Sequence, residues 1–315
     1  MDELEWDGPI TPTTLSKRLK IIQEGRNLPE VSTLSERFPE AIIDEMGALS
    51  DPHWPEIGDL EQVFQKATLE LAKMGVADSS GDLDRRLDML VSAAQELRSS
   101  WTTSEARCVE WSGLFITEAN LDSQRNDIPV AISSSRTISE AAEKLGVNPP
   151  KHLPSDLEWS SMLSQANTVT RSSEILDQIE NAIREIANIH SPSLSALLGP
   201  ISAAKLISLA GGRERLARMP SGSLQVLGAH AAMSAHRRGA PPPKHGAVLF
   251  SMPQVSRSPR WVRGKIARYL AGKASIAVRV DNFEGERWDE SKIEEINSEI
   301  EAIKKKFPRP PKRGV

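Results

Sequence analysis

The sequence is short of several residue types that define common classes of protein. It has one cysteine, Cys108, and one tyrosine among 315 residues, and aromatic residues make up 4% of the chain. A single cysteine cannot form an internal disulfide, which excludes a disulfide scaffold and favours a reducing, cytoplasmic setting. No apolar run approaches the ~18 residues that cross a membrane. The acidic start MDELEWDGP does not resemble a secretory signal. We therefore expect a cytoplasmic protein with no membrane segment.

Residues for catalysis and metal binding are equally scarce. The six histidines are scattered along the chain, so their spacing does not predict convergent metal ligands. The serines lack a nucleophile elbow, and Gly211-Gly212 and Gly264 match neither a dinucleotide fingerprint nor a Walker loop. We expect no enzyme activity, no cofactor and no metal.

Acidic residues are nearly absent from residues 201–280, called here the basic block. This block contains fourteen Lys or Arg and a single acid, Glu214, for a formal charge of +13. The rest of the chain must therefore carry −17 to give the net −4, and residues 1–80 alone carry −9. Such a block attracts polyanions, of which nucleic-acid backbones are the commonest. A solvated surface on a stable domain is the alternative.

Helical periodicity dominates what is present, and alternating strand-like runs are scarce, which predicts a mainly α fold. One heptad seam consists of Leu83, Leu87, Leu90, Ala94, Leu97 and Trp101. It predicts a coiled-coil helix that continues to about Trp111, ~43 Å long at ~1.5 Å per residue. A second seam consists of Leu176, Ile179, Ile183 and Ile186, with Ser172 or Ser173 as a helix cap. The simplest arrangement is an antiparallel helical hairpin with an elaborated tip; one buried face in a compact bundle is the alternative.

The tip contains a segment that resembles the start of a helix-turn-helix. Thr137 and Glu140 fit a capping box, and Gly146 fits a helix stop. Pro149 and Pro150 follow where a recognition helix should begin, and prolines obstruct one there. A capped structural helix is favoured, and a DNA-reading helix is the alternative.

The C-terminal half reads as short helices between Gly and Pro breaks. Gly239–Gly246, with the sequence GAPPPKHG, is a stiff loop, and Ala247–Met252 fits a short extended piece. Arg260–Val280 predicts a long helix. A last heptad starts after the cap Asp289 and consists of Ile293, Ile296, Ile300, Ile303 and Phe307. Its apolar face can pack on the domain or bind a partner.

The basic block suits RNA. It offers Arg and Lys for phosphates, and Lys244 or His245 at the end of the stiff loop could contact or stack on a base. Its few aromatic residues argue against a single-strand stacking platform and favour a structured RNA that is recognised by shape and backbone.

Several stretches in this half, taken in order, resemble one known family. They are Ser195–Ile201 (SALLGPI), Lys205–Gly212 (KLISLAGG), Gln225–Ala229 (QVLGA), Pro243–Gly246 (PKHG), Ser258–Arg268 (SPRWVRGKIAR) and Ala277–Asp281 (AVRVD). Residues 193–281 thus resemble the Nop domain of the archaeal scaffold protein of box C/D guide ribonucleoproteins and of spliceosomal relatives. The resemblance implies an all-α Nop domain with a C-terminal helix at 191–315 and a coiled-coil arm with an elaborated tip at 81–190. From their own residues, positions 1–80 are expected to form a reduced or divergent, mostly helical N-terminal region.

The resemblance also implies a role. Such scaffolds direct RNA 2′-O-methylation without catalysing it. Their Nop domain clamps kink-turn guide RNA together with its small ribosomal-protein-like binder, their N-terminal domain holds the fibrillarin methyltransferase, and their arm mediates self-association. A DNA-binding regulator and a protein-only adaptor are the alternatives.

The candidate site follows from the same resemblance. Lys244 and His245 would contact the kink-turn RNA, and Gly228, Ala229 and His230 would lie at the RNA–protein composite surface. The expected phosphate clamps are Arg257, Arg260, Arg263, Lys265 and Arg268.

The sequence departs from the family in two places. After Gly228-Ala229 the family has Glu-Lys-Ala-Leu-Phe, whereas this chain has His230-Ala-Ala-Met-Ser234, so local contacts are expected to differ. Only about 80 residues precede the arm, and they do not resemble the family's mixed α/β N-terminal domain. Whether fibrillarin still docks there is left open.

Overall fold

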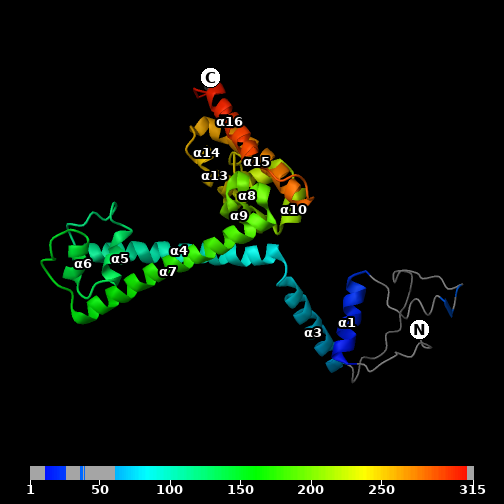
Figure 1. The fold of residues 1–315 in the computed structure, drawn as a ribbon, viewed down its shortest axis with the longest axis horizontal. Helices are drawn as coiled ribbons and strands as arrows, with labels where there is room; N and C mark the ends of the chain where they lie inside the picture. Colours follow the sequence, from blue (N-terminus) through cyan, green and yellow to red (C-terminus); the bar gives the residue numbers. More distant parts are fainter. Residues whose placement is uncertain (1–10, 26–35, 38, 40–60, 311–315) are drawn as a thin grey trace. The chain divides into compact units, whose positions relative to one another are not determined.

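The structure is a computed structural model that describes residues 11–25, 36–37, 39 and 61–310 (Figure 1). Within these residues the chain forms fifteen helices and no strand. The expected mainly α fold is confirmed. The chain divides into two compact units, Met1–Asp82 and Leu83–Val315. The finer boundaries expected at residues 80 and 190 stay a prediction.

The first unit contains two helices, α1 (Pro12–Gln23) and α3 (Glu61–Ser79). Thr11 begins α1 through a capping box with Thr14. The buried Ser16 joins the two helices, because its hydroxyl donates to the carbonyl oxygen of Ala67 at 2.8 Å. Of the mostly helical region expected at residues 1–80, residues 1–10, 26–35, 38 and 40–60 lie outside the described residues.

The second unit begins with an antiparallel hairpin, called here the arm, made of α4 (Leu83–Gly113) and α7 (Asp156–His190) (Figure 1). An ion pair joins Arg98 of α4 to Glu180 of α7. Nearer the tip, the Gln165 amide donates to the carbonyl of Ser104 at 3.3 Å. The expected hairpin is therefore present, with α4 two residues longer than the seam predicted.

The expected start of α7 at Ser172 or Ser173 is wrong. The helix begins after Ser155, whose hydroxyl accepts the backbone N–H of Glu158 at 3.3 Å. Ser172 and Ser173 lie inside the helix, where backbone N–H groups already bond to the preceding turn and no cap is needed. The seam marked only the half of α7 that packs near the basic block.

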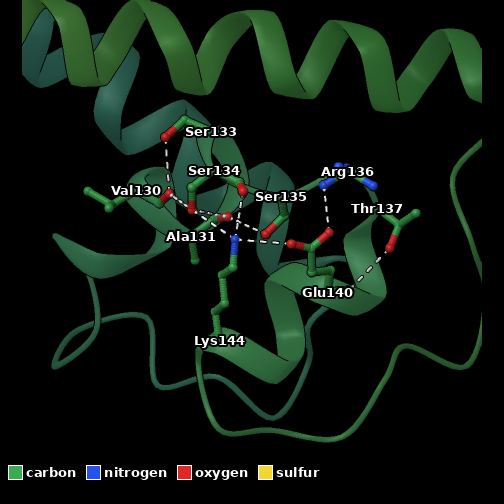
Figure 2. A network of polar contacts seen from close by, with 9 residues as sticks. All are labelled: Val130, Ala131, Ser133, Ser134, Ser135, Arg136, Thr137, Glu140 and Lys144. Atoms are coloured by element: carbon green, nitrogen blue, oxygen red, sulfur yellow. Dashed lines mark hydrogen bonds and ion pairs between the residues drawn. The ribbon is translucent and has the colours of Figure 1, made fainter.

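The tip between the arm helices holds α5 (Asp127–Ser133) and α6 (Ile138–Lys144) over a separate apolar cluster. Figure 2 shows the polar network that joins them: the Lys144 ammonium donates to the Ser134 carbonyl at 2.6 Å and pairs with Glu140 at 3.2 Å. Thr137 caps α6 as expected, but the Glu140 carboxylate accepts from the N–H of Arg136 rather than from that of Thr137.

The tip does not form a helix-turn-helix. Gly146 ends α6 with a φ of +73°, as expected, and the Val147 N–H donates back to the Ala142 carbonyl at 3.1 Å. Residues 147–155 are not helical, so no recognition helix follows. The DNA-reading alternative is not supported.

Residues 192–282, which contain the basic block, fold as short helices around one long one. In chain order these are α8 (Pro192–Leu198), α9 (Pro200–Ala210), α10 (Arg213–Arg218), α11 (Ser221–Gln225), α12 (His230–Arg237), α13 (Ala247–Ser251), α14 (Pro253–Ser256) and α15 (Arg260–Asn282). Their apolar core is continuous with the base of the arm, where Leu87, Ile183 and Ala187 are fully buried. The expected extended piece at Ala247–Met252 is wrong: it is helix α13, which buries Val248 and Leu249.

The long helix expected at Arg260–Val280 is α15, which lies at the centre of this core and buries Ile266, Leu270, Ala274 and Ala277. Asp289 caps α16 (Glu290–Lys306) by accepting the N–H of Lys292 at 2.9 Å. Ile296 and Ile300 are buried in the same core. The last heptad therefore packs on the domain itself.

A group of hydrogen bonds fixes the arm to the basic block. Asp84, in the first turn of α4, contacts the His190 ring at 2.7 Å and accepts the backbone N–H of Arg213 at 2.9 Å. The Arg213 guanidinium in turn donates to the carbonyl of His190 at 2.5 Å. Both helices of the arm are thus tied to the start of α10.

In the described part of the chain, no individual helix has the length and apolar composition of a membrane span. Only α8 and α9 taken together pass that test, and the pair is bent by 116°.

Candidate nucleic-acid interface

The stiff loop predicted at Gly239–Gly246 is held at its end by hydrogen bonds to Gln225, the last residue of α11. The Gly246 N–H donates to the Gln225 carbonyl at 2.7 Å, and the Gln225 amide donates to the Lys244 carbonyl at 2.6 Å. A Cβ on Gly246 would lie 1.9 Å from the carbonyl oxygen of Leu227. Only glycine permits this approach, so the local sequence fixes the position of the backbone at Lys244.

This loop and the first half of α15 enclose an open groove of about 630 Å³. Its lining consists of Gln225, Pro241, Pro242, Pro243, Lys244, Trp261, Gly264, Lys265 and Arg268. A Cβ on Gly264 would come within 3.4 Å of the Lys244 side chain, so the loop packs closely over the helix. Three of the predicted RNA-binding residues, Lys244, Lys265 and Arg268, therefore share one groove.

The C-terminal end of α16 reaches the edge of this groove. The Trp261 indole N–H donates to the Phe307 carbonyl at 3.0 Å, and the Lys265 ammonium lies 4.2 Å from the centre of the Phe307 ring. Such a cation–π contact orients the lysine without neutralising it. Lys265 remains exposed beside the groove.

His245 and Arg263 both contact a different aromatic residue, Phe250. The His245 ring stacks on Phe250 at 4.8 Å between ring centres, and the Arg263 guanidinium lies 5.5 Å from the same ring. Arg263 also donates to the carbonyls of Ser258 and Ser256, both at 2.8 Å. The predicted clamp Arg263 thus ties the turn between α14 and α15, while its role toward phosphate stays a prediction.

The other predicted residues do not line the groove. Arg257 and Arg260 are exposed at the junction of α14 and α15, just before Trp261. Gly228, with a φ of +80°, ends the α11 segment that anchors the loop, and the exposed His230 opens α12. The predicted residues therefore lie in two neighbouring segments of one domain, residues 228–245 and residues 257–268.

The cations of this surface have no acidic partner within the described residues. No ion pair there involves Lys244, Arg257, Arg260, Arg263, Lys265 or Arg268. Acids gather instead toward α16, where burial together with Glu299 and Glu295 raises the pKa of Tyr269. The groove thus offers uncompensated positive charge to a ligand.

Sequence reasoning did not assign Gln225, Trp261 and Gly264 to the site. The signal was available for two of them, because positions 261, 264, 265 and 268 lie on one face of a helix by spacing. Gln225 acts through a contact to a residue nineteen positions away, which periodicity does not encode. Within the residues that the structure describes, no group of three His, Cys, Asp or Glu side chains could hold a metal.

Comparison with known proteins assigns this region to a family. Residues 113–305, from the end of α4 to the last turn of α16, match the Nop family, whose description is "snoRNA binding domain, fibrillarin". An uncharacterized NOP5 family protein of Methanocaldococcus jannaschii is 32% identical over 239 residues, which cover 75% of this chain and 57% of that protein. Nucleolar protein 56 of Caenorhabditis elegans is 37% identical over 130 residues, which cover 41% of this chain and 26% of that protein.

A crystal structure of a fibrillarin/Nop5p complex contains a chain that aligns with 84% of this one, with 25% identity and a TM-score of 0.44. The chain spans between a quarter and three fifths of the length of the two curated relatives named above. The family match covers more than half of the residues and includes the whole groove. The chain therefore belongs to the Nop family.

Proposed function

We propose that this protein is a non-catalytic RNA-binding scaffold of a box C/D guide ribonucleoprotein, which directs RNA 2′-O-methylation. The observation that carries the proposal is the groove that joins Lys244, Lys265 and Arg268 beside unpaired arginines, in a domain of the Nop family. The RNA is a kink-turn guide RNA, bound together with its small ribosomal-protein-like binder.

Two features support a structured RNA over a flexible single strand. Trp261 is the one aromatic side chain among the residues that line the groove, so it cannot stack a run of successive bases. The cations lie on helix α15 and on a loop fixed by two hydrogen bonds to Gln225, one to its backbone and one from its side chain, which suits a ligand of defined shape.

Three further features belong to the proposal. The arm mediates self-association, and residues 1–82, of which helices α1 and α3 are described, are the docking region for fibrillarin. The assembled complex acts in the cytoplasm. Support for the fibrillarin partner comes from the Nop family, whose description names fibrillarin beside snoRNA binding.

Capture of a pre-formed complex tests the RNA-binding part. A transcribed box C/D kink-turn RNA, bound to its small protein, is titrated with the full-length chain in a gel-shift experiment. Replacing Lys244 and Arg268 by Ala should weaken binding at least ~10-fold, because two phosphate contacts are lost.

The matched control replaces Arg215 and Arg218 of α10, two exposed bases of the same block that do not line the groove. We expect it to bind like the wild type. Equal losses in both variants would contradict a role for the groove. Tight binding to duplex DNA, or purified complexes that contain protein but no RNA, would favour the regulator or the adaptor instead.

A further inference from the structure

The end of helix α16 is physically joined to the lining of the groove. Trp261 and Lys265, which both line the groove, each contact Phe307, through an indole hydrogen bond of 3.0 Å and a cation–π contact of 4.2 Å. Phe307 also packs against the domain core. These contacts therefore hold the C-terminal end of α16 in a fixed position beside the candidate RNA surface.

Positive charge accumulates at that place. Lys305, Lys306 and Arg309, called here the C-terminal basic cluster, are exposed, and none of them forms an ion pair within the described residues. Lys304, by contrast, is bound to Glu301 at 2.6 Å. In the sequence, no acid follows Glu301, and Lys312 and Arg313 come shortly after the cluster.

A purely structural role accounts for only part of this cluster. Lysines in a last helical turn complement the helix dipole, which suits Lys305 and Lys306. Arg309 lies beyond the helix, between Pro308 and Pro310, where the helix cannot continue. The helix dipole therefore explains neither the position of Arg309 nor the hydrogen bond that joins the end of the helix to Trp261 of the groove.

We infer that the C-terminal basic cluster is a second phosphate-binding surface, which takes the backbone of the same RNA beyond the nucleotides in the groove. This inference rests on the proposed function. The cluster presents cations without exposed aromatic or amide side chains of its own, so it fits phosphates rather than base edges. Trp261 acts as a positioning residue that sets the cluster beside the groove.

Salt dependence counts the phosphates that the cluster contacts. The full-length chain is titrated onto a kink-turn RNA bound to its small protein, at several salt concentrations. One RNA has a short stem, and a second is longer by about ten base pairs. Replacing Lys305, Lys306 and Arg309 by Ala should reduce the slope of log affinity against log salt by about 2–3 on the long RNA. The slope on the short RNA should stay unchanged.

The control replaces three exposed bases by Ala, Arg107 and Arg171 of the arm and Lys151 of the tip, and removes the same charge. Its slopes should equal those of the wild type. An unchanged slope for the cluster variant overturns the inference while the proposed function stands. A wild-type chain that does not capture the RNA overturns both. Lost binding to the small protein alone, with the RNA slope intact, identifies an acidic protein partner and overturns the inference.

Trp261→Phe tests the positioning role, since it keeps the ring and removes the N–H that holds Phe307. It should weaken binding of the long RNA in the wild type and have no further effect in the cluster variant, because both changes act through one contact. Additive losses would overturn the positioning role. Thermal unfolding of each variant checks that the fold is intact.

Discussion

Gly246 sets how closely two backbone segments approach in the candidate interface. A methyl group there would meet the carbonyl of Leu227 at 1.9 Å, so either the loop or the segment that follows α11 must move. Gly246→Ala should therefore lower both the unfolding temperature and the affinity for the RNA complex, because Lys244 follows the loop. Thermal unfolding and gel shift measure the two effects.

Gly272 provides the control for that substitution. It lies inside α15 with no atom within 4 Å of an added Cβ. Gly272→Ala should leave RNA binding unchanged and stabilise the fold by up to about 1 kcal/mol, since alanine favours a helix. A Gly246→Ala protein that behaves like this control would disprove the close-approach argument.

Arg263 and Arg268 look equivalent in the sequence but not in the structure. Arg263 donates to two carbonyls, those of Ser258 and Ser256, whereas Arg268 lines the groove and has no ion-pair partner within the described residues. Arg263→Lys should cost about 1–2 kcal/mol of unfolding free energy, because an ammonium cannot reproduce this geometry. Arg268→Lys should leave stability unchanged and reduce RNA affinity only slightly. Chemical denaturation distinguishes the two, and equal stabilities would refute the difference.

Charge and residue type directed attention to the basic block, and the binding of RNA by its residues stays a prediction; the arrangement of these residues required the structure. The count of acids and bases pointed to the basic block, and Lys244, Lys265 and Arg268 do meet in one groove. The stacking of His245 on Phe250 was not predictable, because it depends on the path of the backbone between them. Local composition contains no information on such a contact.

At the scale of elements, Asp84 connects the arm to the basic block and makes the connection sensitive to acid. Burial opposes its ionisation, but hydrogen bonds from the His190 ring and the Arg213 N–H outweigh it and lower the pKa of Asp84. A carboxyl with a lowered pKa stabilises the fold above the pKa of the unfolded chain, about 4. This stability is lost as the pH falls through the folded value.

Asp84→Asn should accordingly lower the unfolding midpoint at pH 7 and flatten its dependence on pH below about 4. Urea unfolding between pH 2 and 7 measures both. The comparison variant is Asp122→Asn at the exposed tip, whose profile should follow the wild type. If Asp84→Asn shows the same acid dependence as the wild type, other carboxyls govern the transition.

The tip has its own anchoring ion pair. Glu105 of α4 is 3% exposed, and the Arg125 guanidinium binds both of its carboxylate oxygens at 2.6–2.9 Å. Arg125→Ala should leave a buried carboxylate unpaired and lower the unfolding temperature by several degrees. Arg107→Ala, which breaks an exposed pair with Glu110, should have little effect. Similar shifts in calorimetry would contradict this ranking.

Element prediction succeeded where one periodic face extends along a helix, as in α4, α15 and α16. It failed where the two halves of a helix pack through different faces against different parts of the protein. The first half of α7 packs on the tip through Met162, Ala166 and Val169, while the second half packs near the basic block through Leu176 and Ile183. A periodic apolar pattern on one continuous helix face is therefore found in only one of these halves. Similarly, the five residues of α13 are too few to show a period.

For the whole molecule, the separation of charge is the property that bears most directly on function. A chain with net charge −4 contains a block of +13, and the cations of its groove have no acidic neighbours among the residues that line it. If about six phosphates are contacted, log affinity for the RNA complex should fall with log salt at a slope of roughly −5. Filter binding across a range of salt concentrations measures it, and a slope near zero would exclude electrostatic binding.

Helix α7 has a mechanical consequence for any assembly that uses both ends of the arm. Its 35 residues run without a break from the tip cluster to His190, where Asp84 and Arg213 hold it. At ~1.5 Å per residue the helix acts as a lever about 52 Å long, so a rotation of about 5° at the held end moves the far end by about 4–5 Å. A small change in the orientation of the basic block on its ligand would therefore cause a larger displacement of the tip. The stiffness of the contacts around His190 would determine how closely the position of the tip follows the position of the basic block.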